Sequence, residues 1–279
     1  MAAEESKIKN VVIVASDDSG SSKKEEEKKV ETGIDLGLSL DKLSLGPQKK
    51  LLVIPLGGLI VHRAHVRDKF KLPKNRRPDL SYGNFMVYKR PFCESFLKFC
   101  FERFEVGLWS SAMEHNIETV LTQLIGELKN KFLFSWDQNQ CTKTRFTCFG
   151  SKHKPLFLKE LKYIWEKKYS SGEYSSSNTL LITDPEKALL NPPNTAIFPK
   201  EYNVKKKDDD FLGPNGELRA FLDGLVESKD VESYVKNHPF GEPAITPSHS
   251  QWDYYEKIIS SLGKEESSDE EYWDSDCSY

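Results

Sequence analysis

One stretch of the chain, residues 51–56, constrains the fold more than any other because every one of its positions is apolar. A strand with one face in water alternates apolar and polar residues, whereas a strand inside a parallel sheet is apolar on both faces. Gly57 and Gly58 follow directly and predict a turn at the end of the strand. The stretch therefore predicts the central strand of a parallel sheet.

Downstream, short apolar runs alternate with segments of helical period as far as about residue 263. Apolar residues at three- and four-residue spacing predict a helix over 91–104, with Pro91 at its first position, and a second helix over 113–125. Further helices are predicted around 158–165 and over 216–228, and strands over 104–109, 131–135, 179–183 and 195–198. This alternation predicts an α/β fold, a three-layer α/β/α Rossmann-like parallel sheet with its site at the carboxyl ends of the strands.

The two ends of the chain differ from this central block, which we place at residues 49–263. Residues 1–48 are dominated by Ser, Lys, Glu and Asp, and residues 264–279 are acidic. Such compositions bury too little apolar surface to offset the entropy of ordering. The sequence therefore predicts disordered N- and C-terminal tails around one domain.

Composition excludes several classes of protein. The 40 Lys and Arg residues nearly balance the 43 Asp and Glu residues, so direct nucleic-acid binding is not expected. The five cysteines are odd in number and form no CxxC pair, which favours free thiols in a reducing compartment. No apolar run is long enough for a membrane span. We therefore expect the nucleus or the cytoplasm and no membrane association.

Six short motifs, in order, resemble the small C-terminal-domain phosphatase family, also called the NLI-interacting-factor family, of the haloacid dehalogenase-like superfamily. They lie at residues 88–92, 109–112, 136–141, 156–161, 180–184 and 191–199. The resemblance covers roughly residues 49–262 and implies a haloacid dehalogenase-type (FCP-homology) domain. It also implies a Mg²⁺-dependent phosphoprotein phosphatase that works through an aspartyl-phosphate.

The same resemblance places two acidic residues of the mechanism at positions where this chain has none. The nucleophile falls on Pro55 and the general acid on Gly57, and neither residue can attack phosphorus, donate a proton or bind a metal. The acidic metal-binding pair falls on Thr183 and Asp184, so at most the Asp184 carboxylate remains. The sequence therefore predicts a catalytically degenerate phosphatase-like domain with no bound cofactor.

Two positions that the resemblance assigns to phosphate binding are kept, Ser110 and Lys159. Together with backbone N–H groups of the turn at residues 57–58, they predict an anion pocket without hydrolysis. The hypothesis is a module that binds a protein partner, in its narrower form one that carries phosphoserine. In the alternative interpretation, Ser110 only ends a strand and Lys159 is a solvated helix residue.

Two other functions stay open at this point. The first is an active Mg²⁺-dependent serine/threonine phosphoprotein phosphatase, which requires a shifted acid such as Asp184 as nucleophile. The second is a presequence-receptor-like subunit of the mitochondrial inner-membrane translocase, which resembles this domain and works by binding. That subunit needs a membrane anchor and a targeting signal, neither of which is recognisable in this sequence.

Three leucines in the N-terminal segment, Leu36, Leu38 and Leu40, stand at alternate positions. They resemble the Leu-x-Leu-x-Leu motif that recruits co-repressors in plant transcription regulators, in which an extended peptide presents alternate side chains to pockets. A co-repressor is therefore a candidate partner. The alternative is that these leucines pack locally against the domain.

Overall fold

A computed structural model describes residues 48–206 and 208–273, with side chains described as far as residue 263. Residues 1–47, which include Leu36, Leu38 and Leu40, lie outside the described residues. Among the helices in the described ranges, none combines the length and the apolar character needed to cross a membrane.

A five-stranded parallel sheet lies at the centre of the domain, with the order β10-β9-β1-β5-β6. Its strands are β1 (Leu51–Ile54), β5 (Glu105–Trp109), β6 (Phe134–Trp136), β9 (Thr179–Ile182) and β10 (Ala196–Ile197). β1 pairs in parallel with β5 on one side and with β9 on the other. All four residues of β1 are fully buried, which confirms the prediction of a central strand.

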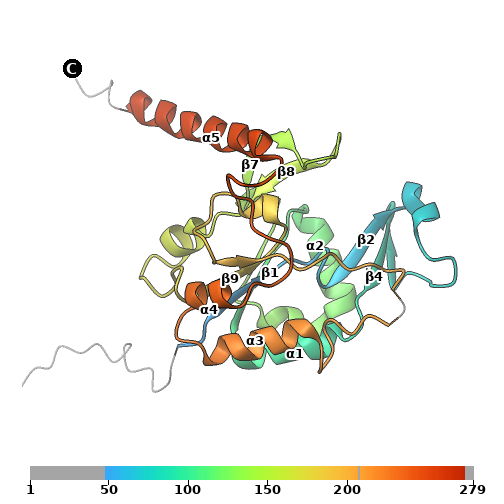
Figure 1. Cartoon of the computed structure of the whole chain (residues 1–279). Coiled ribbons are helices and arrows are strands. Elements are labelled where there is room, and N and C mark those ends of the chain that lie inside the picture. The colour runs from blue at the N-terminus through green and yellow to red at the C-terminus, as the bar shows by residue number, and fades with distance from the viewer. Residues whose placement is uncertain (1–47, 207, 274–279) are drawn as a thin grey trace, which may run out of the picture. The chain divides into compact units, whose positions relative to one another are not determined.

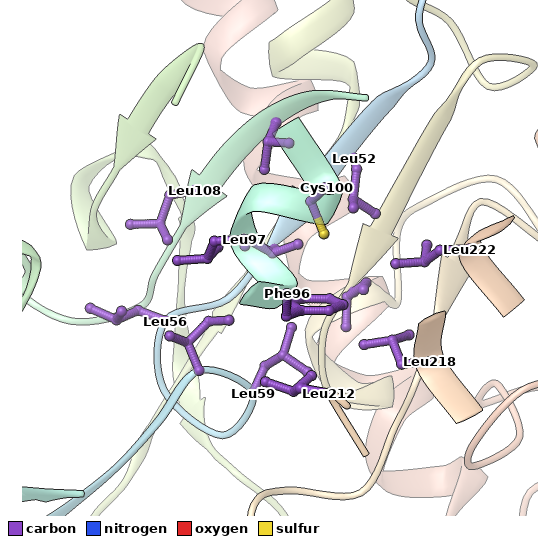
Figure 2. Packing of buried hydrophobic residues seen from close by; sticks show 14 of the residues in the cluster. Leu52, Leu56, Leu59, Phe96, Leu97, Cys100, Leu108, Leu212, Leu218 and Leu222 are labelled. Atoms are coloured by element: carbon purple, nitrogen blue, oxygen red, sulfur yellow. The ribbon is translucent and has the colours of Figure 1, made fainter. Parts of the chain in front are cut away.

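The two faces of the sheet carry separate hydrophobic clusters because successive side chains of a strand point to opposite sides. Leu52 and Ile54 belong to a cluster shared with α1 (Cys93–Arg103) and α3 (Glu217–Glu227), and Figure 2 shows Phe96 of α1 next to Leu218 and Leu222 of α3. Leu51 and Val53 belong to a second cluster on the opposite face. That face is covered by the π-helical turn η6 (Tyr163–Lys168), so the predicted three-layer α/β/α fold is present.

The first two predicted helices are present with different ends. α1 begins at Cys93 rather than at Pro91, because Phe92 has a left-handed backbone (φ 63°) and is 49% exposed. The second comprises α2 (Glu114–Val120) and the π-helical turn η3 (Leu121–Ile125), and it stops at Gly126, where φ is 61°. A 3₁₀ segment, η4 (Gly126–Lys131), then leads into β6.

The helix predicted around residues 158–165 is wrong in its first half. Leu158 ends a strand, β8 (Pro155–Leu158), which forms an antiparallel hairpin with β7 (Thr142–Thr147). Leu156 and Leu158 of β8 lie in the hairpin's own cluster, whereas Phe157 between them packs against the second cluster of the central sheet. A short alternating strand followed by a helical turn therefore gave a spurious helical period.

Several elements were not predicted. An antiparallel sheet of β2 (Val61–His65), β3 (Leu80–Tyr82) and β4 (Phe85–Lys89), with the 3₁₀ helix η2 (Val66–Lys71), is inserted between β1 and α1 (Figure 1). Two helices, α4 (Val231–Asn237) and α5 (Trp252–Trp273), and two 3₁₀ turns, η5 (Gln138–Gln140) and η7 (Pro185–Ala188), complete the fold.

Helix α5 joins the domain through the β7–β8 hairpin, and Figure 1 shows both at the top of the view. Tyr255 and Ile258 of α5 are buried in one cluster with Leu156 and Leu158 of β8. Because α5 runs to Trp273, the acidic segment that we placed at 264–279 begins inside this helix rather than after it. Residues 274–279 lie outside the described residues.

Candidate functional site

A cavity of about 300 Å³ lies at the carboxyl ends of β1 and β5, where parallel α/β sheets place their ligands. We call it the central cavity. Four predicted site residues line it: Pro55 and Gly57 after β1, Ser110 after β5, and Lys159 after β8. Its other polar wall residues are His62, Arg63, Ser111, Asn116, Lys154, Lys187 and Glu201. The structure therefore brings the two degenerate positions and the two predicted phosphate-binding residues together.

The loop after β1 offers an anion fewer free backbone N–H groups than we predicted. Gly58, which has a positive φ of 81°, donates its N–H to the carbonyl of Val61 at 2.9 Å. This N–H group therefore already has a partner within the turn. Gly57 borders open space, since a Cβ atom added there would meet no atom within 4 Å. A carboxylate at position 57 has room in this loop, and the chain lacks it.

Ser110 is held by backbone contacts at the end of β5. Its N–H donates to the carbonyl of Trp136 at 2.9 Å, and its Oγ accepts the N–H of Ala112 at 3.2 Å. The hydroxyl hydrogen of Ser110 is thus still free to donate to an anion. The neighbouring Ser111 Oγ is buried without a hydrogen bond of good geometry to any described residue, and the nearby Cys141 sulfur is only a weak acceptor.

Lys159 is almost completely buried, with 1% of its surface exposed, and it lies in the link between β8 and η6. Its Nζ donates to the carbonyl of Trp109 at 2.7 Å, which holds the ammonium group one residue from Ser110. Burial, and secondly the charge of Lys187, lower the pKa of Lys159 from 10.5 to about 7. The alternative interpretation of Lys159 as a solvated helix residue is therefore wrong.

Lys187 is a site residue that the sequence analysis missed. It lies on η7, three residues after Asp184, and its Nζ is 2.6 Å from Asp184 Oδ2. Burial acts to lower the pKa of Lys187, but the ion pair with Asp184 outweighs it and the pKa is raised. For Asp184, burial acts to raise the pKa, and Lys187 reverses this and holds it below its ordinary value. The only available signal was the i, i+3 spacing after a proline that starts a helical turn.

Asp184 itself does not line the central cavity, but a neighbouring hollow. Thr183, the other degenerate metal position, directly follows β9 and is 4% exposed. Its Oγ1 is buried and forms no hydrogen bond to the described residues. Neither residue of this motif lines the central cavity, whereas Lys187, the ion-pair partner of Asp184, does.

The residues of this site do not fit a Mg²⁺ ion, the cofactor that the resemblance implies. Mg²⁺ binds through carboxylate oxygens, often together with phosphate oxygens. Within the described ranges, no three His, Cys, Asp or Glu side chains are grouped so that they can hold a metal. Lys154, Lys159 and Lys187 line the cavity, and Lys187 already neutralises Asp184. A cationic wall of this kind suits an anion.

A parallel sheet with this strand order and a polar cavity at its carboxyl edge defines a Rossmann-like α/β domain with its site at the ends of the strands. The sequence model of the family described as NLI interacting factor-like phosphatase matches residues 50–232. The chain belongs to this family, and its phosphatase-like domain includes all the site residues described above.

Among curated proteins, the chain is similar to an uncharacterised FCP1 homology domain-containing protein of Schizosaccharomyces pombe. The two are 25% identical over 230 residues, which is 78% of this chain and 88% of that protein.

Two solved structures of the RNA polymerase II CTD phosphatase Fcp1 also resemble the chain. One, from fission yeast and bound to beryllium fluoride, has 14% identity and a TM-score of 0.37, covering 83% of this chain and 68% of the other. The second has 13% identity and the same TM-score, with 83% and 67% covered. Likeness at this level carries no argument about function, so the site must be interpreted from its own residues.

Proposed function

We propose that this domain is a pseudophosphatase that binds phosphorylated protein segments without hydrolysing them. One observation carries the proposal: Lys159 and Lys187 converge with Ser110 on a cavity in which Pro55 and Gly57 provide neither nucleophile nor acid. This arrangement supports a pocket that holds phosphate and lacks the side chains that the family resemblance assigns to breaking the phosphate ester.

The charge distribution of the cavity supports phosphate binding. Hydrogen bonds from ammonium groups to phosphate oxygens are about twice as strong as neutral ones. Burial makes the charged form of Lys159 costly, as its lowered pKa indicates. A phosphate dianion beside it favours the charged form, so part of that cost is recovered on binding. Lys187 provides a second cation in the region where the family holds a metal.

The lost residues argue against turnover. A proline at position 55 has no side-chain nucleophile, and a glycine at position 57 has no proton to give to a leaving group. The remaining candidate, Asp184, is bound to Lys187 and faces another hollow. Loss of a nucleophile alone costs on the order of 10⁶ in rate where the residues act as a unit.

The binding proposal is tested by titration calorimetry with a phosphoserine peptide and its unphosphorylated form. We expect measurable affinity for the phosphopeptide only, and loss of that affinity in Lys159→Met, which keeps an unbranched side chain one atom shorter and removes its charge. Lys229→Gln changes an exposed lysine of the same domain and is the matched control. Equal affinity of the wild type for both peptides contradicts the proposal.

The absence of turnover needs its own assay, because an active phosphatase is the leading alternative. Purified protein with Mg²⁺ is expected to hydrolyse p-nitrophenyl phosphate no faster than a mock purification. Hydrolysis that is abolished by Asp184→Asn favours the active Mg²⁺-dependent serine/threonine phosphatase with a displaced acid instead.

The proposal also includes the cellular compartment and a role for the leucine motif near the N-terminus. We propose a nuclear or cytoplasmic protein in which residues 49–263 bind the phosphorylated partner and Leu36, Leu38 and Leu40 recruit a co-repressor. A pull-down with residues 30–45 deleted tests the role of the leucines. If the variant captures the same proteins as the full chain, these leucines do not recruit a partner. Import into isolated mitochondria tests the remaining alternative, a presequence-receptor-like subunit.

A further inference from the structure

Two hollows adjoin the central cavity, and each shares part of its wall. The first, which we call the β2 hollow, has a volume of about 410 Å³ and shares His62 and Arg63 with the cavity. The second, the β9 hollow, has a volume of about 420 Å³ and shares Lys154 and Glu201. A peptide that places one residue in the cavity can thus extend into a different hollow on each side.

The β2 hollow is cationic. Among the described residues, its wall has three cationic side chains, Arg63, Lys71 and Lys205, and one carboxylate, Asp68. Lys71 Nζ lies 2.8 Å from Asp68 Oδ1 and neutralises that carboxylate. Arg63 donates to the hydroxyl of Tyr82 at 3.4 Å, a neutral partner that leaves its charge uncompensated by this contact. The hollow therefore favours anionic side chains.

The β9 hollow has the opposite balance. Its wall carries four carboxylates, those of Asp184, Glu186, Glu201 and Glu242, against the two lysines Lys154 and Lys200. Asp184 is already neutralised by Lys187, while Glu201 lies at the border with the central cavity. The hollow therefore disfavours anionic side chains and suits cationic ones.

The geometry points to a selective partner. We propose that the domain binds phosphoserine segments of asymmetric charge, with acidic or further phosphorylated residues in the β2 hollow and basic residues in the β9 hollow. This inference rests on the proposed phosphate binding in the central cavity and adds the charge pattern of the partner. Complementary charges across an interface set the register of a partner and exclude wrong ones.

A protein segment fits this arrangement better than other anionic partners do. Nucleic acid and anionic membranes present uniform negative charge along their length or surface. A partner of that kind that occupies the β2 hollow and the central cavity also meets the carboxylates of the β9 hollow. A chain whose charge changes sign on either side of one phosphate avoids this repulsion and matches both hollows.

Two peptides of identical composition test the inference. One has three aspartates before the phosphoserine and three lysines after it, and the other has these flanks exchanged. Calorimetry at low salt is expected to give affinities that differ by about tenfold, the size expected from a few exposed charge contacts, and the difference is expected to shrink as salt is added. Which isomer binds tighter shows the direction of the bound chain.

Charge-reversing variants assign the preference to the β2 hollow. Lys71→Glu combined with Lys205→Glu is expected to abolish the difference between the isomers while a phosphopeptide with neutral flanks binds as before. Lys69→Glu combined with Lys74→Glu changes the net charge equally at exposed positions that do not line the hollow, and it is expected to keep the difference. Thermal melting checks that both double variants are folded.

Two outcomes overturn the inference. If the isomers bind equally while phosphorylation is still required, the charge pattern is wrong and the proposed phosphate binding stands. If neither isomer binds better than its unphosphorylated form, both proposals fail. A third observation also contradicts the inference: a single-stranded RNA or a phosphatidylserine vesicle that binds more tightly than either peptide and is released by the Lys71/Lys205 variant.

Discussion

Two ion pairs of this domain, Arg90–Asp209 and Lys187–Asp184, are built differently. The guanidinium of Arg90 makes two hydrogen bonds of 3.0 Å to the carboxylate of Asp209, and both side chains are no more than 4% exposed. Lys187 and Asp184 share one contact of 2.6 Å, and their side chains are 15% and 30% exposed beside a cavity. The first pair is closed on all sides, and the second borders open space.

The difference in burial assigns the two ion pairs different roles. The Arg90–Asp209 pair stabilises the fold, and the Lys187–Asp184 pair belongs to the central cavity. Arg90 stacks on the ring of Phe211 at 4.4 Å and ties the chain before α1 to the segment around residue 209. Any change in this pair leaves a charge buried without a partner. Lys187 reaches both Asp184 and the central cavity, so its ammonium can be shared with a ligand. We therefore expect the first pair to govern stability and the second to govern binding.

The largest effect is expected for Asp209→Ala. Removal of one partner of a buried pair typically costs about 3–5 kcal/mol in the free energy of unfolding. Asp223→Ala removes the partner of Arg103 in an exposed pair with a contact of 2.9 Å, and a loss below about 1 kcal/mol is expected there. Chemical denaturation of both variants gives the comparison, and equal losses contradict the distinction between the two kinds of pair.

The next effect is expected for Lys187→Gln, and it concerns binding. Loss of one hydrogen bond between charged groups costs about 1.5–3 kcal/mol, so the affinity for a phosphoserine peptide should fall about 10- to 100-fold. The melting temperature should change little, because the exposed side of Asp184 can be solvated. A variant that loses stability and keeps its affinity reverses the roles that we assign to the two pairs.

The pH dependence of stability is a smaller effect, and it isolates Lys159. Its folded pKa of about 7 lies below the ordinary 10.5, so between these values the unfolded chain binds more protons than the folded one. The free energy of unfolding therefore rises with pH in this window by at most about 1.4 kcal/mol per pH unit, and the penalty is fully present below pH 7. Other groups titrate there too, so the relevant quantity is the wild type minus Lys159→Met.

That difference is measured by denaturation at a series of pH values between 7 and 10. We expect the curves of the two proteins to diverge progressively as the pH rises, with the wild type gaining stability relative to the variant. Parallel curves mean that Lys159 is not held in a buried, costly position. They also remove the argument that phosphate stabilises its charged form.

The smallest change in stability is expected for Gly57→Asp. A side chain at this position meets open space, so the free energy of unfolding should change by about 0.5 kcal/mol or less. Gly107→Ala is the contrasting case, because its Cβ would lie 2.2 Å from the ring of Phe134 and the core would have to move. Thermal melting of both variants tests whether position 57 accommodates a side chain and position 107 in the core does not. A strongly destabilised Gly57→Asp contradicts this.

The sequence predicted those helices and strands whose own pattern of apolar residues identifies them. Residues 51–54 are apolar at every position and are followed by a glycine turn, a pattern typical of a central parallel strand, and the structure has a fully buried strand there. The β7–β8 hairpin was missed because the strand Thr142–Thr147 is polar and owes its conformation to its partner strand and to α5. The pattern of apolar and polar residues within one segment cannot show which distant segment will pack against it.

The same limit applies to the site. Pro55, Gly57, Ser110 and Lys159 were assigned through the motifs that resemble a phosphatase family, and they do line one cavity. Lys187 was missed because its role depends on an ion pair and on the direction of η7. Asp209 stands in a run of lysines and aspartates that is typical of a solvated loop, and only the folded chain places it against Arg90.

The central claim is that the cavity binds phosphate through lysines in place of a metal. The most direct test is calorimetry of a phosphoserine peptide in EDTA and again in excess Mg²⁺, with the peptide recovered and its phosphate content measured after each titration. The account predicts the same dissociation constant in both conditions and full recovery of the phosphopeptide. Binding that requires Mg²⁺, or loss of phosphate in its presence, contradicts it.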